Sequence, residues 1–383
     1  MRATVPPVTR PQEVLDSADS RPDTGMETTA RPKVIYLLYT GDMYGTEQMA
    51  ITHLRAVQDK ASVLIVAPDG PLHAAVGEFG IPSVRAETAT DVFKATVQFA
   101  LGPGSLTVLT ASLRHSLIGL LAASLFPWKR TRHFNICHGG TDLVRSYGRK
   151  RVFNKTPIRL VAVSAYCAVL LRRFGVPAQK IVVVDNFLAD ERFPREPARR
   201  DRTSSRLRVV AVTRLVGIKR TELLIEALKL QPMLVDKVSV TIVGAGELLD
   251  QLSSSAKGMD VTFTGFRADI DRVLAESDIF VQTCAVESFG LAVAEAMAAG
   301  VMVVSPDEGG AAEVVGDERY GLLYKADDAA ALAAALVRAV ELPDSARATI
   351  AAAGAERARE KYSSASRRPR LLEVFFPVEG RKV

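Results

Sequence analysis

Short runs of apolar, β-branched residues alternate along most of this chain with longer stretches whose apolar positions follow a helical period. The pattern predicts strands at residues 34–39, 62–67, 106–110, 131–137, 159–163 and 181–184, and again at 209–212, 238–243, 261–264, 279–282 and 301–304. It predicts helices between them, including 46–58, 220–230, 248–256, 270–276, 291–299 and the Ala-rich region 327–362. Such alternation is typical of parallel βαβ units. We therefore expect two doubly wound α/β domains with a ligand cleft between them.

Changes in this pattern predict where the domains begin and end. Residues 190–206 are rich in Arg, hold two prolines and lack apolar periodicity, so they are interpreted as a linker. It would join an N-terminal domain at 31–189 to a C-terminal domain at 207–362. Residues 1–30 are expected to be a disordered leader without the apolar region of a secretory signal. The tail, 363–383, is expected to pack back toward the N-terminal domain.

Composition excludes several classes of protein. Of the 383 residues, 48% are hydrophobic and 24% charged, as in ordinary soluble proteins, which excludes wholesale disorder and a collagen-like fibre. The longest apolar stretch, residues 116–128, is too short to span a bilayer and is expected to be a buried helix. Three widely spaced cysteines without C-x-x-C spacing argue against a disulfide framework or a zinc site and for a reducing cytoplasm.

Loops that follow strands are the places to search for ligand-binding residues. The loop 41–47 contains Gly45 at the predicted start of a helix, where backbone N–H groups and the helix dipole suit a phosphate. A flexible turn is the alternative. The loop 243–246 contains two glycines, but Leu249 stands where a dinucleotide fingerprint needs a third. A structural turn is the better interpretation there.

Two further loops carry charged side chains. Arg214 and Lys219 follow the strand 209–212, where two cations would suit a diphosphate, although a solvated loop is an alternative. Glu287 precedes an apolar helix, Gly290 would open its N-terminus to an anion, and Glu295 lies within it. A carboxylate among buried residues needs a partner, which is either a ligand or an ion pair. This segment is interpreted as a site.

Histidine offers one more candidate. His138 ends the strand 131–137 and could orient a reacting hydroxyl, with a surface or capping role as the alternative. None of the other histidines has a metal-ligand partner at a usable spacing, and no D-x-D motif stands at a strand end. We therefore expect no metal and no cofactor.

The order of these segments resembles that of the retaining nucleotide-sugar glycosyltransferases with an E-x7-E motif, which are similar to glycosyltransferase family 4. The resemblance runs from about residue 33 to 362 and rests on three segments: 161–186, the Arg214–Lys219 loop, and 261–315 with Gly309 to Glu313 after the two glutamates. It implies the GT-B fold, in which two Rossmann-like domains with parallel sheets face each other across a cleft.

The resemblance also implies roles for particular residues. Glu295 would accept hydrogen bonds from the nucleotide ribose, Glu287 would bind the donor sugar's hydroxyls, and Arg214 and Lys219 would neutralise the diphosphate. The remaining donor contacts would come from Phe289, Gly290, Leu291, Gly45 and the base-lining loop with Gly265 and Arg267. His138 would lie near the sugar and the acceptor. Together, His138, Glu287, Arg214 and Lys219 are the expected catalytic group.

The implied reaction is retaining, metal-independent transfer of a hexose from a nucleoside-diphosphate sugar, by default a UDP-sugar, to a hydroxyl. Front-face attack would pass through an oxocarbenium-like ion pair, with the diphosphate taking the acceptor's proton. Domain closure would exclude water. The sequence departs from the family at Arg220 and after Asn186, where many relatives have glycine, and at Tyr44, where they have paired glycines. These departures leave the donor and the acceptor open.

Two other functions remain open: a sugar-nucleotide epimerase of the same fold and a non-catalytic sugar-nucleotide-binding protein. Aromatic residues make up only 6% of the chain, which argues against a nucleic-acid partner. Nine Lys or Arg and one acid between residues 128 and 159 suggest peripheral contact with an anionic membrane, with a solvated surface as the alternative. The acceptor would be a glycolipid or polysaccharide precursor, or an amino sugar or aminocyclitol bound by Asp42, Glu47 and Asp142. The oligomeric state is not predicted.

Overall fold

The computed structural model describes residues 30–139, 147–194 and 206–377. It divides into two compact units. The first contains the residues up to Ile136, then Val152–Val161 and the chain from Leu372 onward; the second contains Cys137–Arg151 and Ala162–Leu371. Both units are therefore discontinuous in sequence, whereas the alternation predicted consecutive domains. The predicted leader up to residue 29 and residues 195–205 of the predicted linker lie outside the described residues.

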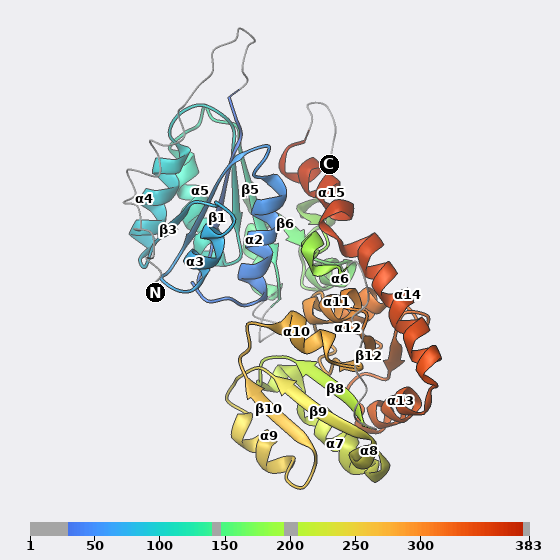
Figure 1. Ribbon diagram of the computed structural model, residues 1–383. Helices are drawn as coiled ribbons and strands as arrows, with labels where there is room; N and C mark the ends of the chain where they lie inside the picture. The colour runs from blue at the N-terminus through green and yellow to red at the C-terminus, as the bar shows by residue number, and fades with distance from the viewer. Residues whose placement is uncertain (1–29, 140–146, 195–205, 378–383) are drawn as a thin grey trace, which may run out of the picture. The chain divides into compact units, whose positions relative to one another are not determined.

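The first sheet has seven strands in the order β3-β2-β1-β4-β5-β6-β7 (Figure 1). Its strands are β1 (Lys33–Leu37), β2 (Ser62–Ala67), β3 (Ser83–Arg85), β4 (Leu106–Thr110), β5 (Thr131–Cys137), β6 (Arg159–Ala162) and β7 (Ile181–Val183). The pairs from β3 to β5 are parallel. Six of the seven strands were predicted. The sequence missed β3, in which Val84 is the one apolar residue.

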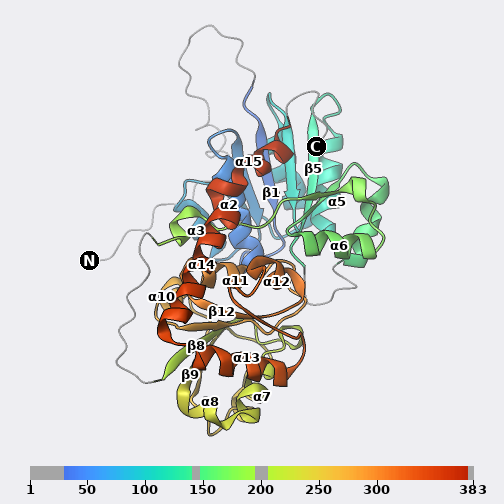
Figure 2. The ribbon, with the colours of Figure 1, turned by 90° about the vertical axis from the view of Figure 1, so that its right-hand side faces the viewer.

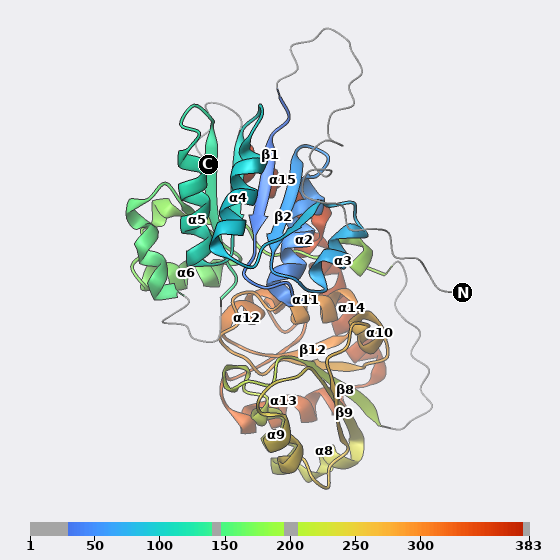
Figure 3. The ribbon, with the colours of Figure 1, turned by 90° about the vertical axis from the view of Figure 1, so that its left-hand side faces the viewer.

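Helices cover this sheet. They are α2 (Gly45–Val57), α3 (Leu72–Gly77), α4 (Ala89–Ala100), α5 (Leu113–Ser124) and α6 (Ala165–Arg173). Helices α4 and α5 lie side by side (Figures 1 and 3) and pack on a core that includes Ile35, Leu37 and Val108. Helix α2 confirms the prediction for residues 46–58.

Helix α5 corrects the prediction of a buried helix at residues 116–128. Small residues, Gly119 among them, form its inner face, and a Cβ added at Gly119 would lie 2.8 Å from Val108 Cγ1. The outer face instead carries Leu117, which is 44% exposed, and Leu121, which is 61% exposed. The sequence was apolar on both faces, so periodicity alone did not indicate which face was buried. Among the described residues, no helix is long and apolar enough to cross a bilayer.

The second sheet has six strands in the order β10-β9-β8-β11-β12-β13, paired in parallel. They are β8 (Leu207–Val212), β9 (Val238–Val243), β10 (Val261–Gly265), β11 (Ile279–Val281), β12 (Met302–Pro306) and β13 (Leu322–Tyr324). All except β13 were predicted. The order reverses between β9-β8 and β11, which is the switch point where ligands bind in such sheets.

The second sheet is also covered by helices. They are α7 (Glu222–Leu230), α8 (Pro232–Lys237), α9 (Leu249–Ser255), α10 (Ile270–Ala275), α11 (Leu291–Ala298), α12 (Gly309–Val315), α13 (Ala329–Glu341) and α14 (Asp344–Tyr362). Helices α7, α8 and α13 pack together on one buried cluster (Figure 2). The two parallel-sheet units give the α/β architecture that the sequence predicted.

The last described helix is α15 (Ser364–Phe375), which follows α14 after Ser363. From Leu372 onward this helix belongs to the first unit. There Phe375 is fully buried, and its ring lies 5.5 Å from the ring of Phe134 and 6.3 Å from that of His53. The described part of the predicted tail thus contributes core residues to the unit formed mainly by the N-terminal half of the chain.

Candidate active site

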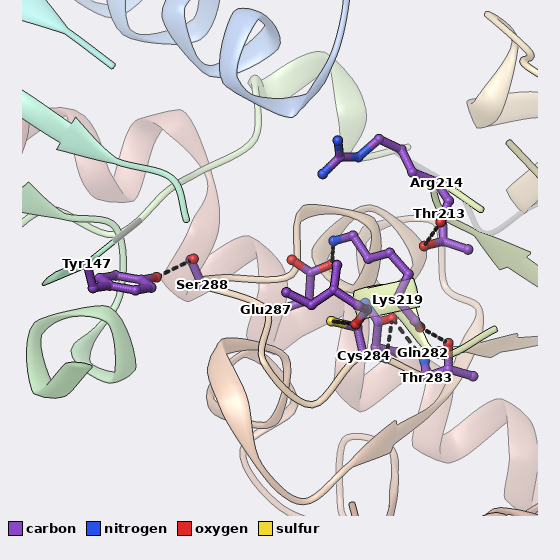
Figure 4. A network of polar contacts seen from close by, with 10 residues as sticks. Tyr147, Thr213, Arg214, Lys219, Gln282, Thr283, Cys284, Glu287 and Ser288 are labelled. Carbon is purple, nitrogen blue, oxygen red and sulfur yellow. Dashed lines mark hydrogen bonds and ion pairs between the residues drawn. The ribbon is translucent and has the colours of Figure 1, made fainter. Parts of the chain in front are cut away.

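The candidate site lies in the second unit, where β8 and β11 end side by side (Figure 4). The loop after β8 leads through a short 3-10 turn, Gly217–Lys219, toward α7, and the loop after β11 leads to α11. Because both strands are parallel neighbours, their loops emerge at one edge of the sheet. The structure therefore brings together two segments that are about 70 residues apart in the sequence.

An ion pair joins these two loops. The Lys219 ammonium donates to Glu287 Oε1, and the two side chains are only 16% and 23% exposed. Partial burial makes the pair less screened than one on the surface. Each residue was predicted as part of the site, but their direct contact was not. Glu287 is thus the counter-ion that holds Lys219 in place.

Hydrogen bonds hold in place the backbone of the two loops that carry this pair. Thr283 Oγ1 donates to the Lys219 carbonyl oxygen at 2.7 Å, and the Cys284 thiol donates to the Ile218 carbonyl at 3.2 Å. The Gln282 side chain is buried and accepts from the backbone N–H groups of Thr283 and Cys284. Burial, with a smaller contribution from the charge of Glu287, raises the pKa of the Cys284 thiol to about 11, so this group stays neutral. The loop after β11 is thus rigidly tied to the loop after β8.

Arg220 completes this turn in an unusual backbone conformation. Its φ of 54° lies in the left-handed region that favours glycine. The conformation explains why relatives would have glycine where this chain has Arg220. Its guanidinium lies 2.9 Å from Glu222 and 3.7 Å from Asp327, which anchors the strained residue on the second unit.

Arg214 lies on the same loop with a different environment. Its side chain is exposed, and Figure 4 shows its guanidinium held apart from the Lys219–Glu287 pair. Its backbone carbonyl accepts from Thr213 Oγ1 at 3.4 Å. Arg214 and Lys219 thus provide two cations on one loop. Arg214 extends into solvent, whereas Lys219 is held by its ion pair with Glu287.

The N-terminus of α11 lies next to Glu287. Gly290 has a φ of 94° and precedes Leu291, the first residue of the helix, while Phe289 is buried against Tyr362. The loop packs closely on the start of α12: the Gly310 N–H donates to the Glu287 carbonyl at 2.7 Å. A Cβ on Gly310 would lie 2.5 Å from the Ser288 carbonyl carbon. Gly309 and Gly310 therefore allow the start of α12 to approach the backbone of the loop after β11, because neither residue has a side chain.

Glu295 lies one turn further along α11 and is 13% exposed. Burial raises the pKa of its carboxyl to about 7, an effect that Arg192 reduces and Asp271 increases. The Arg192 guanidinium lies 3.9 Å from Glu295 Oε1 and also pairs with Asp271. Sequence reasoning did not identify Arg192, because it lies in the segment interpreted as a linker. The carboxyl of Glu295 thus ionises near neutral pH, with one cation beside it.

The predicted base-lining loop follows β10. Gly265 has a φ of 70°, and its carbonyl accepts from the Gly244 N–H at 2.8 Å. Phe266 is 66% exposed, and the Arg267 guanidinium donates to both carboxylate oxygens of Asp269. An exposed aromatic ring beside an oriented guanidinium offers surfaces on which a base can stack. Within the described residues, no hydrogen bond or ion pair joins this loop to Glu287.

Tyr147 and Ser164, which the sequence did not indicate as site residues, contact Ser288 in the loop after β11. The Tyr147 hydroxyl lies 2.6 Å from Ser288 Oγ, and the Ser164 hydroxyl donates to the Ser288 carbonyl. Ser164 also caps α6 by accepting from the Cys167 N–H, while Glu313 accepts from the first two N–H groups of that helix. An N-cap serine before an apolar run is a sequence signal for a helix start, but it does not indicate a partner more than 120 residues away.

We predict that Tyr147→Phe lowers turnover by about three- to tenfold and destabilises the fold by about 1–2 kcal/mol. Tyr147 is 1% exposed, and the variant leaves Ser288, the residue after Glu287, without its buried hydroxyl partner. Kinetics and denaturant unfolding measure both effects. The matched control is Tyr320→Phe, which keeps the ring that lies under Arg319 and Arg357. Equal activity of the two variants would contradict a positioning role for Tyr147.

The remaining predicted residues lie elsewhere. His138 follows β5 in the second unit and is partly buried, and Asp142 lies outside the described residues. In the first unit, Gly45 is the first residue of α2 and is exposed, and the exposed Asp42 bonds to Thr40 Oγ1. Glu47 is fully buried, and burial raises its pKa to about 7. Glu47 therefore presents no carboxylate to solvent.

Metal ligands are not gathered in the described part of the chain. No group of three or more His, Cys, Asp or Glu side chains there is arranged to hold a metal ion. The three cysteines are buried thiols without a disulfide between them.

Comparison with known proteins extends these observations. Residues 193–356 match the family model described as "Glycosyl transferases group 1". Over 176 residues the chain is 35% identical to the amylovoran biosynthesis glycosyltransferase AmsK of Erwinia amylovora, covering 43% of each chain. Over 155 residues it is 34% identical to a GDP-mannose-dependent phosphatidylinositol monomannoside mannosyltransferase of Mycobacterium tuberculosis, covering 37% of this chain and 40% of the relative. These matches span less than half the length of the curated relatives.

Solved structures match over a greater length. The Anabaena protein Alr3699/HepE, crystallised with UDP and glucose, superimposes with a TM-score of 0.77 over 91% of this chain and 100% of its own, at 19% identity. A glycosyltransferase from Rickettsia africae gives a TM-score of 0.75 at 18% identity, over 92% of this chain and 100% of its own. At such identities the likeness concerns the fold alone. It confirms the GT-B class for the two parallel-sheet units.

Proposed function

We propose that this protein is a retaining glycosyltransferase that transfers a hexose from a nucleoside-diphosphate sugar to a hydroxyl group of an acceptor. The observation that carries the proposal is the Lys219–Glu287 pair, held at the adjoining ends of β8 and β11 with Arg214 on the same loop. Two cations beside a helix N-terminus suit a diphosphate. The Glu287 carboxylate, which directly precedes the buried Ser288 in the same loop, suits sugar hydroxyls. The match of residues 193–356 to a glycosyltransferase family supports it.

In the proposed reaction, the bond between the anomeric carbon and the diphosphate oxygen breaks, and the acceptor oxygen bonds to the anomeric carbon. Negative charge grows on the diphosphate, where Lys219 and Arg214 stabilise it without reorganisation. The acceptor's proton passes to the departing diphosphate, so no separate protein base is required. Attack on the face from which the diphosphate leaves would retain the anomeric configuration. The proposal requires no metal.

The donor proposed by default is a UDP-sugar. The structural relative from Anabaena was crystallised with UDP, which supports this choice, whereas the mycobacterial relative is named as GDP-mannose-dependent. The choice of base would be made by the loop around Phe266 and Arg267. The acceptor is proposed to be a glycolipid or polysaccharide precursor, or an amino sugar core. Three reduced, buried cysteines are consistent with a cytoplasmic location.

The test is mass spectrometry of reactions with UDP-, GDP- and ADP-hexoses, in EDTA, with soluble and lipid-linked acceptors. The expected result is release of a nucleoside diphosphate together with an acceptor heavier by one hexose, whose anomeric configuration by NMR matches that of the donor. An inverted product would overturn retention, and dependence on added metal would overturn the metal-free mechanism. A new sugar nucleotide formed without acceptor would indicate an epimerase, and donor binding without product a non-catalytic protein.

A further inference from the structure

The Arg192 guanidinium lies beside the Glu295 carboxylate, although the two residues come from different elements of the second unit. Arg192 ends the short 3-10 turn Asp190–Arg192, and Glu295 lies within α11. Arg192 Nη2 is 3.9 Å from Glu295 Oε1, and the two side chains are 32% and 13% exposed. Water and salt therefore screen this pair less than they screen an ion pair on the surface.

The backbone around Arg192 is hydrogen-bonded to α14 on both sides. Before Arg192, the Leu188 N–H donates to the Tyr362 carbonyl at 2.7 Å. After it, the Arg359 guanidinium donates to the Pro194 carbonyl at 3.1 Å. Helix α14, which supplies both partners, also packs on α11. The fold thus holds the segment that carries Arg192 in a defined place.

Asp271 sets the distance between the guanidinium and Glu295. It lies near the start of α10 and accepts from Arg192 Nη1. The other terminal nitrogen, Nη2, stays 3.9 Å from Glu295 Oε1, which is longer than a hydrogen bond of roughly 2.7–3.2 Å. Arg192 therefore acts on Glu295 through its charge and does not take up the lone pairs of the carboxylate. Those lone pairs can still accept hydrogen bonds from a ligand.

Burial and Arg192 act on Glu295 in opposite directions. Burial raises the pKa of its carboxyl to about 7, whereas Arg192 lowers the pKa and Asp271 raises it. Of the other elements packed on α11, β12 has no charged residue, and Glu313 on α12 accepts from two N–H groups of α6. The charged residues of α14 are Asp344, Arg347, Glu356, Arg357, Arg359, Glu360 and Lys361. Where the structure describes the chain, Arg192 is thus the cation that favours the ionised form of Glu295.

We propose that Arg192 is a positioning residue for the donor, which keeps Glu295 ionised at neutral pH and leaves both carboxylate oxygens open to the ribose hydroxyls. This inference rests on the proposed function, with Glu295 as the acceptor of hydrogen bonds from the ribose. Without Arg192, a larger fraction of Glu295 carries a proton, and a protonated carboxyl has one lone-pair site fewer to offer. Because Arg192 acts through Glu295, its effect is expected to vanish at a pH at which Glu295 is ionised without help.

Arg192→Gln removes the charge and keeps a polar side chain. An opposite charge nearby typically lowers the pKa of a carboxyl by about one unit or more, so the pH dependence of the donor KM is expected to move upward by about one unit. The donor KM is then expected to rise about fivefold at pH 7 and less than about twofold at pH 9. The value of kcat is expected to stay within about twofold of the wild type at both pH values, because the proposed role concerns binding.

Three further variants isolate the charge of Arg192. Arg192→Lys retains the charge and is expected to restore most of the affinity for the donor at pH 7. The matched control is Arg272→Gln, because Arg272 follows Asp271 on α10, is 73% exposed and pairs with Glu276 instead. It is expected to leave KM unchanged at both pH values. In the Glu295→Gln background, Arg192→Gln is expected to have no further effect on KM, since the group through which it acts is absent.

Unfolding of the ligand-free protein by urea tests the same charge without any substrate. The stability of the native state is expected to decline as the pH rises toward the pKa of Glu295, and in Arg192→Gln the decline is expected to continue about one pH unit further. An unchanged decline would overturn the inference, whatever the protein binds. So would a rise in KM that is equal at pH 7 and pH 9, or one that persists in the Glu295→Gln background, because Arg192 would then act on the donor directly or on the fold. A wild-type protein that binds no nucleoside diphosphate at any pH would overturn the proposed function, and with it the donor role of Arg192.

Discussion

Lys219→Ala is expected to lower kcat/KM by about two to three orders of magnitude while the protein remains folded. In the proposed reaction the ammonium stabilises the negative charge that grows on the diphosphate, so its removal would withdraw stabilisation from the transition state. It also leaves Glu287, which is only 23% exposed, without its counter-ion. Lys219→Arg is expected to restore part of the activity, because it returns the charge but not the geometry of a compact ammonium.

Steady-state kinetics with the donor identified in the screen measure this effect. The control is Lys229→Ala, which removes an exposed lysine from α7 in the same unit. It is expected to leave turnover unchanged. Near-normal kcat/KM in Lys219→Ala, with a normal unfolding transition, would contradict the site as described.

The positions of most strands along the sequence of the second unit were predictable because local signals there agree. The alternation of β-branched runs and helical stretches located β8 to β12 and most of the helices beside them, although not α8 and α12. Strand β3 was missed because Val84 is its one apolar residue, and β13 was missed although its three residues are apolar, as are those of β11, which was predicted. The residues of the site could be selected because they stand immediately after strands, where a doubly wound sheet binds its ligands.

The sequence could not predict which side chains of the site contact each other. The pairing of Lys219 with Glu287 and the hold of Tyr147 and Ser164 on Ser288 join residues that are 68 to 141 positions apart. Such contacts depend on strand order, which no local pattern specifies. Glu47 illustrates the same limit, since it was a candidate contact to an amino-sugar acceptor and the fold buries it completely.

The two faces of α5 were ambiguous for a related reason. Eight of the twelve residues of this helix are apolar or glycine, so its hydrophobic content predicted burial. Packing against the sheet selects the face with the smallest side chains, because backbone proximity to β4 at Gly119 excludes larger ones. The leucines are consequently left outside. Side-chain volume, rather than hydrophobicity, decided the orientation of this element.

Glu295→Gln is expected to raise the donor KM at least tenfold at pH 8. The carboxylate can accept hydrogen bonds from two ribose hydroxyls, whereas the amide offers one oxygen and places an N–H₂ donor against the second hydroxyl. The matched control is Glu226→Gln, which changes an exposed glutamate on α7 and is expected to have no effect. An unchanged KM in Glu295→Gln would remove the ribose role from this residue.

The same variant has a pH signature that a purely structural role would not produce. Burial holds the pKa of Glu295 near 7, above its ordinary value of 4.5, so the native state binds this proton more tightly than the unfolded chain does. Ionisation of Glu295 therefore costs native stability as pH rises from about 4.5 to 7, by up to about 3 kcal/mol. In the proposed contact with the donor ribose, Glu295 accepts hydrogen bonds as the carboxylate, so the wild-type KM is expected to rise as pH falls below 7. In Glu295→Gln both dependences are expected to flatten, which unfolding and kinetic measurements between pH 5 and 8 would show. A wild-type KM that is constant across this range would contradict the assignment, because the carboxylate that the donor needs would then be present at every pH.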